Sequence, residues 1–226
     1  LVRDIEALPS IGLQLNADSL LSPDDLEKAF VLLEIDHLRI NEESLTPQKI
    51  ATTAANGLIL EVALLSSNDG DALKAEVLQL SERVPAGSRL LIQREGRKVV
   101  DETDLPRNES LNTYIPGSDA FLVDLQNPKN SFGKSVSYSI APTVHSFDTE
   151  TIFKTLFTQQ ESINFAQKYV APQVFVSPIT FSTRGNPHSG HSRDQRLTYA
   201  EPEMALHIRT IEGAAWTLGS IFSLAS

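Results

Sequence analysis

Short apolar runs alternate with longer amphipathic segments along most of the chain. Seven of these runs have the length and composition of β-strands, and they cover residues 11–15, 37–40, 58–65, 89–93, 120–124, 136–140 and 173–177. The run at 58–65 is almost continuously apolar, which is typical of a strand buried on both faces of a parallel sheet. The pattern therefore predicts parallel strands that are joined by helices.

Helix signals fall between the predicted strands. Ser22-Pro23, followed by two aspartates, marks the start of one helix, and Thr46-Pro47 marks the start of the next. Apolar residues recur at helical spacing over three further segments, which are 71–83, 149–169 and 208–222. The stretch from 98 to 116 is polar and less regular, and it has room for one short helix.

Two α/β architectures fit this alternation, a doubly wound open sheet and a (β/α)8 TIM-type barrel. Seven strands, each followed by a connection of suitable length, favour the barrel, whose eighth strand would have to follow Ser226. We therefore predict a single α/β barrel domain over residues 1–226, lacking its eighth strand and excised from a larger multidomain chain.

Composition narrows the classes of function. The 226 residues carry a formal net charge of -10, which disfavours nucleic acid and anionic membranes as partners. No apolar run reaches the length of about 18 residues that a transmembrane helix needs. There is no cysteine, so disulfides and thiolate chemistry are excluded. We expect a cytoplasmic protein, although the composition does not fix the compartment.

Candidate catalytic residues lie where predicted strands end, which is where α/β barrels keep their active sites. His145 follows the strand at 136–140, and it could act as a general base or acid near neutral pH. Asp148 could orient the imidazole ring. The alternative is that His145 caps the following helix or fills a polar core pocket.

Further polar residues lie within other predicted strands or next to them. Glu95 could transfer protons or form a surface ion pair with Arg94 or Arg97, and Asp119 could lie in the barrel mouth or make a turn. Arg39 could hold a sugar hydroxyl or a carboxylate, or it could pair with Glu42 or Glu43. The remaining predicted substrate-binding residues are Asn16, Thr143, Thr180 and Arg184.

Other kinds of chemistry find no support in the sequence. No glycine-rich phosphate loop and no G-x-S-x-G serine motif is present. His188 and His191 lie in a long polar loop at 182–201 without helical spacing or an obvious third ligand, so we expect neither a metal nor a cofactor. The loop suits a lid that touches substrate.

Several segments together resemble the barrel domain of the D-apionate lactonase family, hydrolases that open sugar-acid lactones in bacterial apiose catabolism. The most specific are Pro142-Thr-Val-His-Ser-Phe-Asp148, Val176-Ser-Pro-Ile-Thr180 and Gly213-Ala-Ala-Trp-Thr-Leu-Gly219, in the family's order. The resemblance extends from about residue 11 to Ser226, and in the family the barrel lies between other domains. The chain departs from the pattern at Arg94-Glu95, where the family would have a His-Glu pair.

These observations predict a lactonase that acts on D-apionolactone or a related lactone by base-assisted attack of water. His145, Glu95 and Asp119 are the expected catalytic residues. Its expected partners are a small carbohydrate-derived substrate and flanking domains of the same polypeptide. Two alternatives remain, a glycoside hydrolase with paired carboxylates and a non-catalytic carbohydrate-binding relative.

Overall fold

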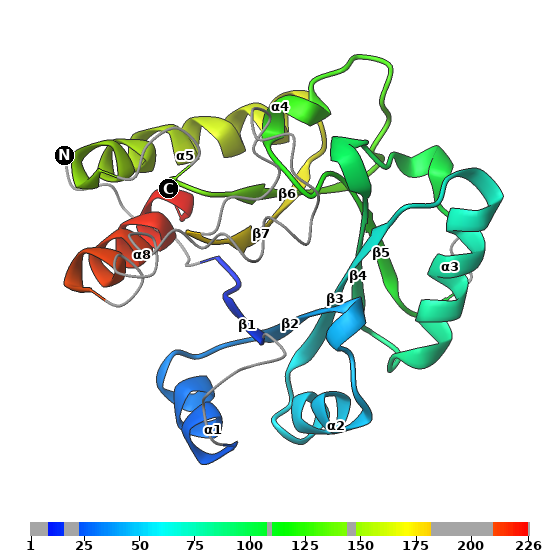
Figure 1. Cartoon of the computed structure of the whole chain (residues 1–226), viewed down its shortest axis with the longest axis horizontal. Coiled ribbons are helices and arrows are strands. Elements are labelled where there is room, and N and C mark those ends of the chain that lie inside the picture. The colour runs from blue at the N-terminus through cyan, green and yellow to red at the C-terminus, as the bar shows by residue number, and fades with distance from the viewer. Residues whose placement is uncertain (1–8, 16–22, 108–109, 144–147, 182–209, 226) are drawn as a thin grey trace. The chain divides into compact units, whose positions relative to one another are not determined.

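The computed structural model describes residues 9–15, 23–107, 110–143, 148–181 and 210–225. It has a mixed α/β fold in which parallel strands alternate with helices (Figure 1). The chain forms two compact units, one comprising Ser10–Gly117 and the other containing Ser118–Ser226. We call them the N-terminal and the C-terminal unit.

The N-terminal unit contains a five-stranded parallel sheet. Its strands pair in chain order and are β1 (Gly12–Leu15), β2 (His37–Asn41), β3 (Ile59–Ser66), β4 (Arg89–Arg94) and β5 (Thr113–Pro116). The connections contain α1 (Pro23–Leu32), α2 (Pro47–Ala55) and α3 (Gly70–Arg83), with three short 3-10 turns at η1 (Glu42–Ser44), η2 (Glu95–Arg97) and η3 (Glu102–Asp104). Five parallel strands alternating with helices fit part of a doubly wound sheet or part of a barrel.

The three helices of this unit lie on one face of its sheet (Figure 1). Alternate strand residues form the core with them, because successive side chains of a strand point to opposite faces. Leu38, Val62 and Ile92 are fully buried in this cluster together with Leu73 and Val77 of α3. The sheet therefore has a helix-covered face, which is apolar, and an opposite face made by the intervening residues.

The C-terminal unit contains a smaller parallel sheet. Its two strands are β6 (Ser135–Ile140) and β7 (Gln173–Ile179), and its described helices are α4 (Leu122–Leu125), α5 (Thr149–Tyr169) and α8 (Ile211–Leu224). The segment 118–120 runs beside β6, since Ser118 N donates to Ser137 O and Ser139 N donates to Ala120 O. Three extended segments thus lie side by side in this unit.

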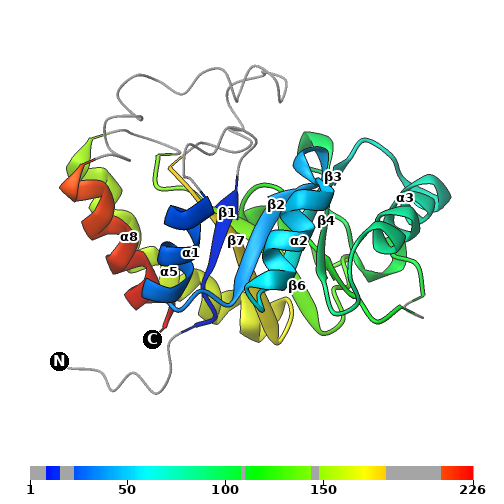
Figure 2. The same ribbon diagram turned by 90° about the horizontal axis from the view of Figure 1, so that it is seen from below.

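Helices α5 and α8 pack against each other, as both views show (Figures 1 and 2). Trp216 of α8 is fully buried, and its Nε1 donates to the carbonyl oxygen of Ile152 at 3.1 Å. Its ring meets that of Phe181 edge-on, with 4.7 Å between the centroids. A second buried link joins Ser220 Oγ to Gln159 Oε1 at 2.6 Å. Trp216 therefore packs in the core of this unit.

Six of the seven predicted strands are present with shifts of one or two residues at their ends, and the fifth prediction is wrong. Residues 120–124 form no strand, because most of the run belongs to the short helix α4. The true fifth strand, β5, lies in the stretch that we expected to be irregular. Four apolar residues in a row fit a buried helix turn as well as a strand, and Pro116 at the end of β5 concealed the strand signal.

Candidate active site

Glu95 follows the carboxyl end of β4 directly and lies exposed on the turn η2. Gly96 makes this turn possible, because its φ of 70° is unfavourable for any residue with a Cβ. The neighbouring Arg94 lies on the helix-covered side and pairs with Asp69 at 3.1 Å. Arg94 is therefore bound to the start of α3, and Glu95 projects from the strand end into solvent.

Arg39 lies in the middle of β2 on the opposite face of the sheet, and only 3% of its surface is exposed. Its Nη1 donates to Gln14 Oε1 at 2.8 Å and to Asn41 Oδ1 at 2.9 Å, and its Nε lies 4.0 Å from Glu61 Oε1. The expected alternative partner Glu42 pairs instead with Arg83 of α3. The guanidinium thus points along β2 toward Asn41, at the carboxyl end of the strand.

A charged cluster lies at the amino-terminal ends of the same strands. Asp36 accepts hydrogen bonds from Ser10 Oγ and from Nδ1 of His37, and Arg89 Nη2 lies 3.8 Å from its Oδ2. His37 Nε2 is 3.8 Å from Glu61 Oε2. Burial by itself raises the pKa of Asp36, but the bonds from Ser10 and His37 and the charges of His37 and Arg89 outweigh it and lower the pKa below its ordinary value.

In the C-terminal unit, three of the predicted residues lie at the carboxyl ends of β6 and β7. Thr143 is buried, and its hydroxyl donates to Phe181 O at 2.6 Å, while Thr180 N donates to Ile140 O at 3.0 Å. These bonds tie the two strand ends together. Asp148 caps α5, because its carboxylate accepts from Thr151 N at 2.8 Å.

Asp119 is half-buried in the extended segment beside β6. Its carbonyl oxygen accepts from Ser139 Oγ at 3.2 Å, and Ser118 Oγ accepts from Ala120 N at 3.1 Å. The second bond closes a local turn of the kind expected there.

Several predictions fall outside the described residues. His145 is the most important of them, and the others are Asn16, Arg184, His188 and His191. Of the predicted residues that the structure describes, Arg39 and Glu95 belong to the N-terminal unit, and Asp119, Thr143, Asp148 and Thr180 belong to the C-terminal unit.

Two polar residues near strand ends were missed by the sequence reasoning. Gln93 is fully buried one residue before the end of β4, and Asn41 is the last residue of β2. Both lie on the same face as Arg39, since Asn41 is two residues beyond Arg39, and Gln93 is four residues beyond Arg89, the β4 residue in register with Arg39 through Glu61. For Asn41 the signal was present in the alternation of polar and apolar residues along β2, whereas β4, with three apolar residues in a row before Gln93, does not alternate.

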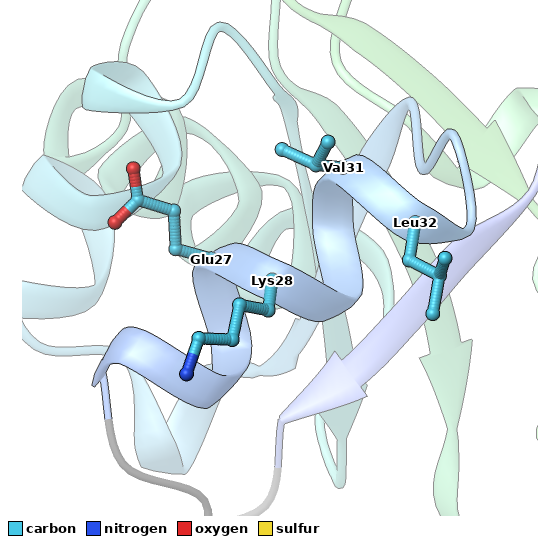
Figure 3. Close-up of a pocket in the computed structure, with 4 residues that line it drawn as sticks. All are labelled: Glu27, Lys28, Val31 and Leu32. Carbon is cyan, nitrogen blue, oxygen red and sulfur yellow. The ribbon is translucent and has the colours of Figure 1, made fainter.

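Two surface hollows lie over helices, one over α1 and the other over α3. One, of about 590 Å³, is lined by Glu27, Lys28, Val31 and Leu32 on the outside of α1 (Figure 3). It is open, and those of its lining residues that the structure describes come from a single helix. Among the described residues no group of three or more histidine, aspartate or glutamate side chains could hold a metal ion.

Comparisons with known proteins return no family model, no curated protein and no solved structure that matches this chain. Within the part of the chain described here, no helix is both long and apolar enough to cross a membrane.

Proposed function

We propose that this chain is a hydrolase that opens a sugar-acid lactone, and that its two parallel sheets are parts of one (β/α)8-type barrel. The observation that carries the proposal is the position of the polar residues. Glu95 follows β4, Thr143 and Asp148 follow β6, and Thr180 follows β7, so each lies after the carboxyl end of a parallel strand. This is the end at which α/β barrels hold their substrates.

The strand order supports the same architecture. In each unit, strands that are consecutive in the chain are also neighbours in the sheet, as a barrel requires. Asp119 lies in the segment that runs beside β6 and directly follows the N-terminal unit.

Lactone hydrolysis defines what the residues have to do. A base takes a proton from water, and the water oxygen attacks the carbonyl carbon to give a tetrahedral oxyanion. The ring C–O bond then breaks, and the leaving alkoxide takes a proton to give a hydroxy acid. We assign proton transfer to His145 and Glu95, and positioning of the substrate to Asp119, Arg39 and Thr180.

The proposal is tested by incubating the purified chain with D-apionolactone and measuring acid release. Replacing His145 by Ala should reduce kcat by about a hundredfold or more, and Glu95→Gln should also reduce it strongly, because each change removes a proton-transfer group. The matched control is Glu102→Gln, which removes an exposed carboxylate from the turn η3 and should leave kcat unchanged.

The products separate this function from a glycoside hydrolase. A lactonase releases acid without a new reducing end, whereas a glycosidase releases a reducing sugar. If the chain hydrolyses no sugar-acid lactone, or if His145→Ala and Glu95→Gln both retain full activity, the proposed mechanism is wrong.

A further inference from the structure

Three serines lie on one face of β6, because they alternate along the strand with larger, mainly apolar residues. They are Ser135, Ser137 and Ser139, and none of them is more than 8% exposed. Tyr138 lies on the other face, where its hydroxyl is 2.6 Å from that of Ser162 in α5. Burying a hydroxyl costs free energy unless it forms a hydrogen bond, so the partner of a buried serine shows what the hydroxyl does.

Ser139 lies nearest the carboxyl end of β6, and its hydroxyl contacts the backbone at Asp119. The hydroxyl is shared between two carbonyl oxygens, Ala120 O at 2.6 Å and Asp119 O at 3.2 Å. Ser139 N also donates to Ala120 O, at 2.8 Å. Ser139 therefore holds both Asp119 and the residue that follows it against the edge of β6.

The bonds of Ser118 fix the same segment from its other end. Ser118 N donates to Ser137 O at 3.0 Å, and Ser118 Oγ accepts from Ala120 N at 3.1 Å. Ser118 is fully buried and Ala120 is 1% exposed, whereas Asp119 between them is only half-buried. Of these three consecutive residues, Asp119 is thus the one that a ligand can reach from solvent.

Thr180 is held at the opposite edge of the same strand end. Its N–H donates to Ile140 O at 3.0 Å, and successive residues of a strand direct their backbone groups to opposite edges. Asp119 and Thr180 therefore lie on either side of β6, about two interstrand spacings or roughly 10 Å apart along the backbone. Both are residues to which the proposed function assigns positioning of the substrate.

We propose that Ser139 is a positioning residue for this reaction, because its hydroxyl fixes the backbone from which Asp119 binds a hydroxyl group of the sugar-acid lactone. This inference rests on the proposed function. An ionised carboxylate accepts hydrogen bonds from sugar hydroxyls, and such bonds weaken steeply when the acceptor is misplaced. Without the Ser139 hydroxyl, Ala120 O keeps the bond from Ser139 N, so the segment stays paired with β6. The contact at Asp119 O is the one that is lost.

The test compares Ser139→Ala with the wild-type chain in two assays. The first measures kcat and KM for D-apionolactone, and the second measures the Kd for D-apionate by titration calorimetry. Poorer placement of Asp119 should raise KM and Kd by about fivefold, in line with the loss of roughly one hydrogen bond. It should leave kcat nearly unchanged, because the bond is made in the ground state as well as in the transition state.

A matched control separates positioning from stability. Ser88→Ala removes a serine hydroxyl that is equally buried, at 2% exposure, and that also donates to a carbonyl oxygen, Pro85 O at 2.7 Å. It lies before β4 in the N-terminal unit, and no residue of the proposed site is among the partners of its hydroxyl. Both variants should unfold at a slightly lower urea concentration, and Ser88→Ala should leave KM and Kd unchanged.

A double-mutant cycle shows whether Ser139 acts through Asp119. Asp119→Ala should itself raise KM and Kd, and adding Ser139→Ala to it should raise them no further, because the carboxylate that Ser139 positions is gone. An equal rise in both backgrounds would mean that Ser139 acts independently of Asp119 and would overturn the inference.

The outcomes distinguish this inference from the proposed function. Unchanged KM and Kd in Ser139→Ala or in Asp119→Ala of an active lactonase overturn the inference alone. A wild-type chain that binds D-apionate with the expected dependence on both residues and hydrolyses no lactone overturns the function alone. A wild-type chain that neither binds D-apionate nor hydrolyses its lactone overturns both.

Discussion

Gly12 of β1 lies against the imidazole ring of His37, and this contact predicts a specific interaction between two mutations. A Cβ built at Gly12 would overlap the ring, with Cε1 of His37 only 2.6 Å away. The ring cannot turn aside freely, because Nδ1 is bonded to Asp36 and Nε2 faces Glu61. The substitution Gly12→Ala should therefore strain the sheet between β1 and β2.

The magnitude follows from two opposing effects. Forcing an extra methyl group into a packed site costs about 1–3 kcal/mol. Replacing glycine by alanine inside a strand returns roughly 0.5–1 kcal/mol of conformational entropy. We expect Gly12→Ala to lower the free energy of unfolding by about 1–2 kcal/mol in the wild-type background. In a His37→Ala background the ring is gone, and the same substitution should be neutral or stabilising.

The assay is a double-mutant cycle measured by urea unfolding and far-UV circular dichroism. The coupling energy between positions 12 and 37 should equal the overpacking cost, which is about 1–3 kcal/mol. An equal loss of stability in both backgrounds would refute the contact between Gly12 and the ring as its cause.

Two further predictions concern Asp36 and Trp216. Because the folded-state pKa of Asp36 lies below the ordinary value of 3.8, its carboxylate stabilises the fold above that pH and loses this effect as the pH falls through the folded-state pKa. The difference in free energy of unfolding between wild type and Asp36→Asn, measured by urea titration, should thus be constant from about pH 5 to 7 and shrink below about pH 4. A difference that grows in acid would contradict this prediction. Trp216→Phe removes the indole N–H that donates to Ile152 O and leaves a gap beside Phe181. The free energy of unfolding, measured by thermal unfolding, should therefore fall by about 2 kcal/mol. A fall of less than about 0.5 kcal/mol would contradict the packing described.

The helix starts and most strands could be predicted because their signals are local. Pro47 lies in the first turn of α2 and Thr46 caps it, with its hydroxyl accepting from Lys49 N, as the sequence indicated. The fifth strand could not be predicted, because Thr113–Pro116 is short and pairs only through distant residues of β4. Strand pairing of this kind depends on tertiary contacts that leave no local pattern.

The candidate site was predictable in part for the same reason. The sequence predicted that Glu95 and Thr180 lie next to strand ends, which the structure shows after β4 and β7. It could not predict on which face of a sheet a side chain lies. Arg94 and Gln93 are adjacent in sequence and lie on opposite faces of β4. The fold was needed to show that Arg94 lies on the helix-covered face, where it pairs with Asp69. Asp148 was expected to orient His145, which lies outside the described residues, and local sequence did not show that the Asp148 carboxylate caps α5.

The single tryptophan has a practical consequence for studying the two units. Trp216 is buried in the C-terminal unit, and the sequence of the N-terminal unit contains no other indole. Its fluorescence emission therefore follows only one of the two units, while an amide signal follows both. Superimposable denaturation curves from the two probes would indicate that the units melt as one cooperative body, and separated curves would indicate that each melts by itself.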